Sequence, residues 1–311
     1  MALETVKDCI NDLNKEEFYA KKIKNSVLKN FNIAMCYLSI VKYEQTFYKN
    51  QGEYTRNCCN LIMDELCGNI KHVVLKTEDN FSIDCWDINP ENSKKYIIIF
   101  SGIGSEKSNT NLQKAYLKFV KNGWGVIAFD YRGRGKSSGF FCQKNALNDA
   151  YAVRNYLLSK GIHSYDIGVL GHSMGAGVAL DFASKNNMAF VVLINPFNKA
   201  ADMVKNIAKQ LKLPDFIKNT VRKLPDFLIP LKNRFNNENA LNKVQAPTLI
   251  IHTKEDDTIP VKLCRRLIQK NKDKKNITYF ELEGTDHEIN DDKIELCMHF
   301  IDESHLWFFN K

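Results

Sequence analysis

The chain has 311 residues, of which 44% are hydrophobic and 26% charged, and its formal net charge is +8 at pH 7. This composition is typical of a globular protein and excludes a disordered chain or a fibre. A net positive charge favours contact with nucleic acid, anionic lipid or acidic substrates. The lysines and arginines are spread along the sequence, however, without a dense basic run interleaved with aromatic residues, so we expect no nucleic-acid partner.

The nine cysteines are scattered and follow neither the spacing of a zinc site nor that of a small disulfide framework. Residues 1–17 carry charged and polar side chains throughout, unlike a cleavable signal peptide. Both features favour a reducing compartment, and we expect a cytoplasmic protein without a bound metal. No apolar run approaches the roughly 20 residues that cross a bilayer, so no transmembrane segment is predicted, and peripheral contact with a membrane stays open.

Residues 1–69 are predicted to form a helical N-terminal extension. Apolar side chains recur there at helical spacing, as in Val6, Ile10 and Leu13. The segment carries no chemical motif, so the sequence does not decide between packing, oligomerisation and a role at a pocket. We place the main domain at residues 70–311.

The main domain alternates between apolar runs and helix-compatible segments. Residues 71–87 show the pattern of an antiparallel hairpin around a turn-prone stretch at 78–80. Short apolar runs, as expected for strands buried on both faces, follow at residues 96–100, 126–129, 167–170, 190–194, 248–252 and 278–282. Helices are expected at 112–121, 146–159, 176–183 and 292–309. This order predicts an α/β protein with a doubly wound, mostly parallel sheet.

Residues 196–242 interrupt the alternation. They contain amphipathic helical pieces in which lysines alternate with phenylalanine and leucine. We interpret this segment as an inserted helical cap, because so long a connection in a compact fold is commonly a lid over a site. A pair of solvated helices is the alternative.

The sequence Gly171-His172-Ser173-Met174-Gly175 follows the apolar run 167–170 and precedes a helix-compatible segment. A strand, a Gly-x-Ser-x-Gly turn and a helix together are typical of a nucleophile elbow. The serine projects there from a tight, strained turn, and glycines on either side avoid collision with the neighbouring strand and helix. We therefore predict Ser173 as the nucleophile.

A serine nucleophile needs a general base that is held by a third group. Two segments supply such groups, each directly after a predicted strand. Acidic residues at 255–257 follow the run 248–252, and His287 follows the run 278–282. The chain order of serine, acid and histidine is the one that this architecture requires.

These motifs resemble those of the α/β-hydrolase superfamily, in particular its esterase, lipase and serine-aminopeptidase-like members. The resemblance covers about residues 71–309 and includes the elbow, the stretch 130–139 and the segments around Pro260 and His287. It implies a triad of Ser173, His287 and an acid. Because the acid of this family lies four residues before that proline, the resemblance selects Asp256 over Asp257.

The resemblance also implies an oxyanion hole made of two backbone N–H groups, those of Met174 and Ile103. Many family members carry His-Gly in the loop after the first inner strand. This chain has Ser101-Gly102 instead.

We therefore expect a serine hydrolase that cleaves a carboxylic ester or thioester through an acyl-enzyme, without a cofactor. The apolar side chains of the predicted cap favour an apolar acyl group, and its lysines favour an anionic head group or a membrane surface. A lipid ester or acyl thioester is the preferred substrate. An acyltransferase with the same acyl-enzyme and a non-enzymatic interaction protein that retains the fold are the alternatives. The sequence does not set the oligomeric state.

Three further features lie beside the predicted site. We interpret His172 and His252 as structural, since the first is common in elbows and the second ends a strand. Asp130 and Arg132 predict an ion pair that stabilises the Gly-rich loop around them.

Overall fold

A computed structural model describes residues 70–88, 93–103, 105–203, 206 and 235–309 of the chain. These residues belong to the second of two compact units into which the chain divides, Cys58–Lys311. The predicted extension 1–69 and residues 207–234 of the predicted cap lie outside the described residues. Both therefore stay predictions.

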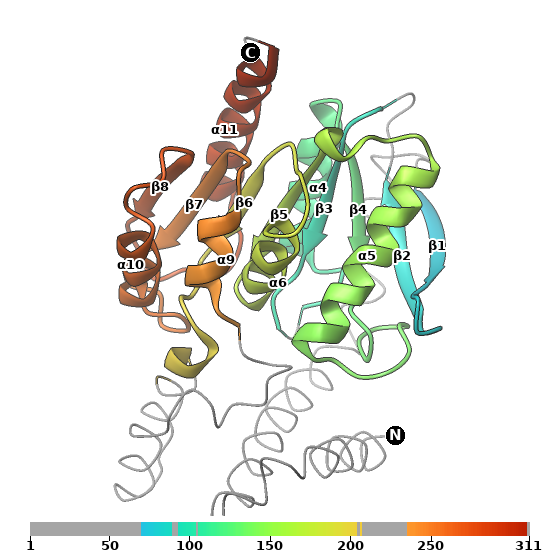
Figure 1. Cartoon of the computed structure of the whole chain (residues 1–311), viewed down its shortest axis with the longest axis horizontal. Coiled ribbons are helices and arrows are strands. Elements are labelled where there is room, and N and C mark those ends of the chain that lie inside the picture. The colour runs from blue at the N-terminus through green and yellow to red at the C-terminus, as the bar shows by residue number, and fades with distance from the viewer. Residues whose placement is uncertain (1–69, 89–92, 104, 204–205, 207–234, 310–311) are drawn as a thin grey trace, which may run out of the picture. The chain divides into compact units, whose positions relative to one another are not determined.

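The strands of the described residues form one sheet (Figure 1), and they are β1 (Ile70–Lys76), β2 (Ser82–Ile88), β3 (Tyr96–Phe100), β4 (Gly125–Phe129), β5 (Ile167–His172), β6 (Val191–Ile194), β7 (Thr248–Thr253) and β8 (Ile277–Leu282). Their order across the sheet is β1-β2-β4-β3-β5-β6-β7-β8. β1 and β2 form the predicted hairpin, and β2 pairs with β4 in antiparallel orientation. The other neighbours are parallel. The predicted mostly parallel sheet is confirmed.

Helices cover both faces of this sheet (Figure 1). α4 (Thr110–Lys121) and α11 (Asp291–Phe309) pack with one buried cluster of apolar side chains. The opposite cluster contains side chains of α5 (Gln143–Ser159), α6 (Met174–Ala183), α9 (Asn237–Lys243) and α10 (Val261–Lys270). Connections that place helices on both faces make the sheet doubly wound, as predicted.

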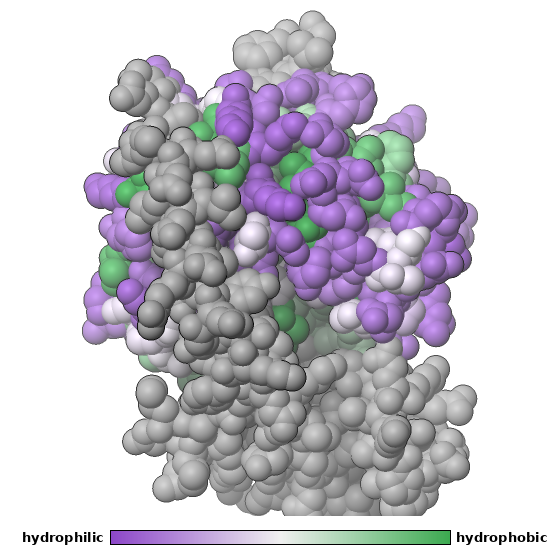
Figure 2. Space-filling view, turned by 180° about the vertical axis from the view of Figure 1, so that it is seen from behind, coloured by the Kyte–Doolittle hydropathy of each residue, from purple (hydrophilic) through white to green (hydrophobic). Residues whose placement is uncertain are grey.

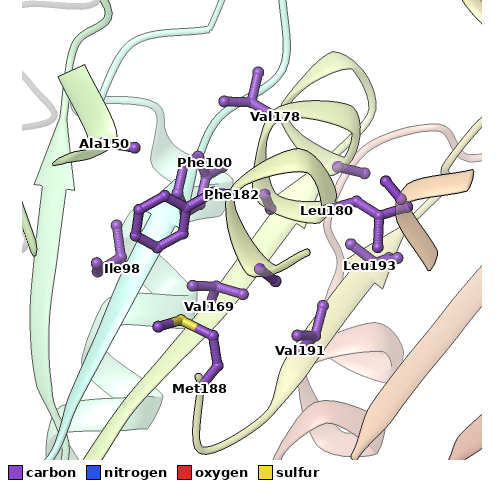
Figure 3. Packing of buried hydrophobic residues seen from close by; sticks show 14 of the residues in the cluster. Ile98, Phe100, Ala150, Val169, Val178, Leu180, Phe182, Met188, Val191 and Leu193 are labelled. Carbon is purple, nitrogen blue, oxygen red and sulfur yellow. The ribbon is translucent and has the colours of Figure 1, made fainter. Parts of the chain in front are cut away.

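The central strands are buried on both faces, which explains their unbroken apolar sequences. In β3, Ile98 and Phe100 point toward the α5 and α6 side, whereas Ile97 and Ile99 belong to the cluster on the α4 and α11 side. Figure 3 shows Ile98 and Phe100 packed beside Phe182 of α6. Burial of each such side chain contributes about 1.5–3 kcal/mol to folding. The strands that carry the candidate site are thus rigidly held.

The carboxyl ends of β3, β5, β6, β7 and β8 lie at one edge of the sheet, because these strands are parallel. Ligands of open α/β sheets bind at this edge. Two residues of the predicted cap, Lys199 and Asn236, form an isolated antiparallel bridge and thus lie side by side. α9 follows the bridge and contributes Ala240 and Leu241 to the buried cluster around α6.

Hydrophilic residues dominate the part of the described surface that is visible from behind in Figure 2. The large apolar side chains that are exposed lie on separate elements: Val74, Ile103, Tyr165 and Phe280. Among the described helices, none combines the length and the apolar character that a membrane span requires.

Candidate active site

Ser173 occupies a strained turn between β5 and α6. Its backbone has φ 56° and ψ −122°, in the left-handed region that disfavours residues other than glycine. The turn is held by a hydrogen bond from the Ser173 N–H to the Ile194 carbonyl (2.9 Å) and by one from the Ala176 N–H to the Ser173 carbonyl (3.1 Å). Strain that the surrounding structure enforces is typical of functional sites.

The two glycines of the Gly-x-Ser-x-Gly motif are required by close packing. A Cβ atom on Gly175 would lie 2.1 Å from the Phe100 carbonyl oxygen. A Cβ atom on Gly171 would lie 2.6 Å from the Cα atom of Ala176. Because both obstructing atoms belong to the backbone, neither can move aside cheaply, and the motif is needed for the turn itself.

The structure brings Ser173, His287 and Asp256 together from three separate loops. His287 Nε2 lies 3.0 Å from Ser173 Oγ, and His287 Nδ1 lies 2.7 Å from Asp256 Oδ2. An ionised carboxylate can only accept hydrogen bonds, so the Nδ1 atom carries the proton. Nε2 is then free to accept the proton of the Ser173 hydroxyl. This is the tautomer that a general base requires.

Asp256, and not its neighbour Asp257, faces His287. Its second oxygen, Oδ1, accepts hydrogen bonds from the backbone N–H groups of Thr258 and Ile259, each at 2.8 Å. Burial disfavours the charged carboxylate, but the hydrogen bond from His287 and those two backbone bonds outweigh burial and lower the pKa of Asp256. Asp256 is thus a buried, ionised partner of the imidazole, whereas Asp257 is exposed.

The loop after β3 lies directly against the serine. A Cβ atom on Gly102 would be 3.3 Å from the Cβ atom of Ser173. Ile103 follows in this loop, and Met174 is the first residue of α6, where backbone N–H groups have no partner within the helix. Both predicted oxyanion donors therefore belong to segments that adjoin the nucleophile, and their role stays a proposal.

The predicted ion pair between Asp130 and Arg132 is wrong. Asp130 accepts hydrogen bonds from the backbone N–H and the ammonium of Lys107, in the loop after β3. Arg132 instead pairs with Asp149 of α5 (2.7 Å) and with Asp79 in the hairpin turn (2.7 Å). The two side chains serve different contacts, and Asp130 anchors the segment that also carries Ile103.

Both neighbouring histidines are buried, and each donates a hydrogen bond to a loop that carries Asp256 or His287. The Nε2–H group of His172 donates to the backbone carbonyl of His287 (2.8 Å). Burial lowers the pKa of His172 to about 3, so the ring stays neutral at physiological pH. His252 donates to the carbonyl of Ile259 (2.8 Å), on the segment that supports Asp256. The structural interpretation of both histidines is confirmed, and they hold the two loops of the site.

Sequence reasoning missed two polar residues of the site, Asn195 and Lys293. Asn195 directly follows β6, is fully buried, and donates from Nδ2 to the His287 carbonyl (2.7 Å). Lys293 lies in the first turn of α11 and is also fully buried. The sequence could have indicated Asn195, because it directly follows a buried strand, at the edge of the sheet where ligands bind.

Metal ligation has no support in the part of the chain that the structure describes. No group of three or more histidine, cysteine, aspartate or glutamate side chains gathers there in a way that could hold an ion.

Sequence comparison relates the chain to hydrolases. Residues 91–236 match the family model described as serine aminopeptidase, S33. Protein R595 of Acanthamoeba polyphaga mimivirus is 31% identical over 218 residues, which are 65% of this chain and 69% of that protein. The lysophosphatidylserine lipase ABHD12 of Danio rerio is 24% identical over 189 residues, which are 57% of this chain and 47% of the lipase. The match thus spans about half of that lipase.

Solved structures share the fold. The Pyrococcus furiosus esterase Pf2001 has a TM-score of 0.64 and 23% identity, with 78% of this chain and 93% of the esterase covered. An alpha-beta hydrolase from Vibrio vulnificus has a TM-score of 0.65 and 20% identity, with 86% and 91% covered. At these identities the likeness concerns the fold, while the family model and the sequence relatives support hydrolase activity. The chain belongs to the α/β-hydrolase superfamily.

Proposed function

We propose that the protein is a serine hydrolase that cleaves a carboxylic ester or thioester. Ser173 is the nucleophile, His287 the general base and Asp256 the residue that orients the imidazole. The observation that carries this proposal is the unbroken chain of hydrogen bonds from Ser173 Oγ through His287 to Asp256, with the serine on a strained turn. The esterase and lipase names among the similar proteins support the same reaction class.

The reaction follows from the proton positions. As Ser173 Oγ attacks the substrate carbonyl carbon, its proton moves to His287 Nε2, and the carbonyl oxygen becomes an oxyanion. The backbone N–H groups of Met174 and Ile103 stabilise that oxyanion, each by about 3 kcal/mol. The leaving alcohol or thiol then takes the proton from Nε2, which leaves an acyl-enzyme. Water repeats the sequence, releases the carboxylic acid and restores the serine.

An apolar acyl group suits the described surroundings of Ser173. Ile103 exposes 56% of its surface on the loop that adjoins the serine. ABHD12, the relative named above, is a lysophosphatidylserine lipase, and its substrate is therefore a lipid ester. We therefore propose a lipid ester or acyl thioester as substrate.

A fluorophosphonate probe tests the nucleophile, because an activated serine displaces its fluoride and becomes phosphonylated. We expect the wild-type protein to be labelled at neutral pH and the Ser173→Ala variant not to be. Mass spectrometry of the labelled peptide identifies the modified residue, and circular dichroism verifies that the variant is folded. Equal labelling of both proteins, or label on another serine, would contradict the proposal.

A series of 4-nitrophenyl esters tests the acyl preference. Each additional buried methylene contributes about 0.8 kcal/mol, so kcat/KM is expected to rise about three- to four-fold per methylene until the site is filled. Initial rates at fixed enzyme concentration, below the micelle concentration of each ester, give the ratio. Rates that are independent of chain length, or highest with acetate, would count against an apolar acyl site.

A further inference from the structure

The backbone around His287 is held by buried side chains at three successive carbonyls. The Lys293 ammonium donates to the carbonyls of Asp286 (2.7 Å) and Glu288 (2.6 Å), one on each side of the histidine. His172 and Asn195 donate to the carbonyl of His287 itself. Three successive carbonyl groups of one loop are thus fixed from inside the protein.

The place of Lys293 is unfavourable for a cation on two grounds. The side chain is fully buried, and removing an ammonium from water is costly unless its donors are satisfied. It also lies in the first turn of α11, where the helix dipole repels positive charge. The lysine therefore has a purpose other than filling space, and its two carbonyl contacts indicate what that purpose is.

We propose that Lys293 is a positioning residue for the proposed reaction. By bridging the carbonyls on either side of His287, it fixes the path of the backbone at that residue. The imidazole then stays within hydrogen-bond distance of both Ser173 Oγ and Asp256 Oδ2. Lys293 acts through His287 and has no contact with the reacting atoms. This inference rests on the proposed serine hydrolase function.

The chain offers a matched control, Lys274. Its ammonium also donates to two backbone carbonyls, those of Asn242 (3.0 Å) and Val244 (2.7 Å). These carbonyls belong to the last turn of α9 and to the residue that follows the helix, and neither residue is one of the proposed catalytic residues. Lys274→Met therefore removes the same kind of interaction without touching the loop of His287.

The kinetic test compares Lys293→Met with Lys274→Met on an ester that the wild-type protein hydrolyses. We expect Lys293→Met to lower kcat by about 10- to 100-fold with KM changed by less than about two-fold, because a small misplacement of a catalytic group is costly while substrate binding is unaffected. Lys274→Met should keep the wild-type kcat. An unchanged kcat in Lys293→Met would overturn the proposal.

A second readout does not depend on turnover. We expect the Nδ1 proton of His287, in its 2.7 Å hydrogen bond to Asp256, to give a far-downfield proton resonance, which its loss in His287→Ala would assign. We expect this signal to broaden or vanish in Lys293→Met and to persist in Lys274→Met. If the wild-type protein proves to lack activity that depends on Ser173, the proposed function fails, and this resonance still decides whether Lys293 positions the imidazole.

A milder variant, Lys293→Gln, keeps the test informative if Lys293→Met does not fold. Its amide can still donate to one of the two carbonyls, so we expect a loss of kcat between those of wild type and Lys293→Met. Thermal melts of all the variants accompany the rates. If both Lys293 variants unfold at the assay temperature, the residue is needed for the fold as a whole, and the positioning role is overturned.

Discussion

Replacing His287 by alanine is expected to lower kcat for ester hydrolysis by about 10⁶-fold, because loss of the base removes the function of the whole triad. His287 Nε2, at 3.0 Å from Ser173 Oγ, is the group that the structure offers as acceptor of the serine proton. Without it the serine hydroxyl must ionise unaided at neutral pH. KM should change little, since the imidazole contributes mainly in the transition state.

The measurement requires a fluorogenic ester and protein that is free of wild-type enzyme, because traces of wild type would dominate so low a rate. His299→Ala is the matched control. His299 lies on α11, is largely exposed and pairs with Glu303 of the same helix (3.2 Å), so its loss should leave kcat unchanged. If His287→Ala retained more than about a tenth of the wild-type rate, the proton would have to move to a group other than His287.

Most of the fold could be predicted because each buried strand appears in the sequence as one short, strongly apolar run. Residues 96–100 were predicted as a strand buried on both faces, and β3 has those bounds. Such runs indicate strands whatever surrounds them, since a parallel strand covered on both sides tolerates few polar residues. The elbow was predictable for a related reason, because Gly171 and Gly175 meet backbone atoms of adjacent elements and no other residue type fits.

The residues that hold the backbone around His287, Asn195 and Lys293, could not be predicted in the same way. Asn195 and His287 are 92 residues apart in sequence, and their hydrogen bond exists only because β6 ends beside the loop after β8 in the folded sheet. Lys293 follows Asp291 and Asp292, and such a charged helix start indicates a solvated face. Its burial depends on the path of a neighbouring loop, which no local pattern describes.

The error at Asp130 and Arg132 has the same origin. Opposite charges two residues apart suggest a local ion pair, but in the turn after β4 their side chains reach different elements. Arg132 pairs with Asp149 on α5, and Asp130 binds Lys107 after β3. Proximity in sequence was therefore a poor guide to partners in a Gly-rich loop, where the chain reverses within a few residues.

Replacing Asp256 by asparagine is expected to lower kcat by about 10⁴-fold while the geometry of the site is kept. The two backbone N–H groups of Thr258 and Ile259 donate to Asp256 Oδ1, so an asparagine must place its carbonyl oxygen there. Its NH₂ group then faces His287 Nδ1, which has to become an acceptor. The ring proton consequently moves to Nε2, facing Ser173, and the imidazole can no longer accept the serine proton.

The neighbouring carboxylate provides the matched comparison. Asp257→Asn removes the same charge one residue away, on an exposed side chain. We expect kcat to stay within about two-fold of wild type, because solvent screens an exposed charge and leaves it little effect on the free energy of the transition state. Steady-state kinetics of the two variants, with equal thermal stability as a check, separate the two carboxylates. If Asp257→Asn lost activity and Asp256→Asn kept it, the buried hydrogen bond at 2.7 Å would not be the one that orients His287, and the proposed assignment of the acid would fail.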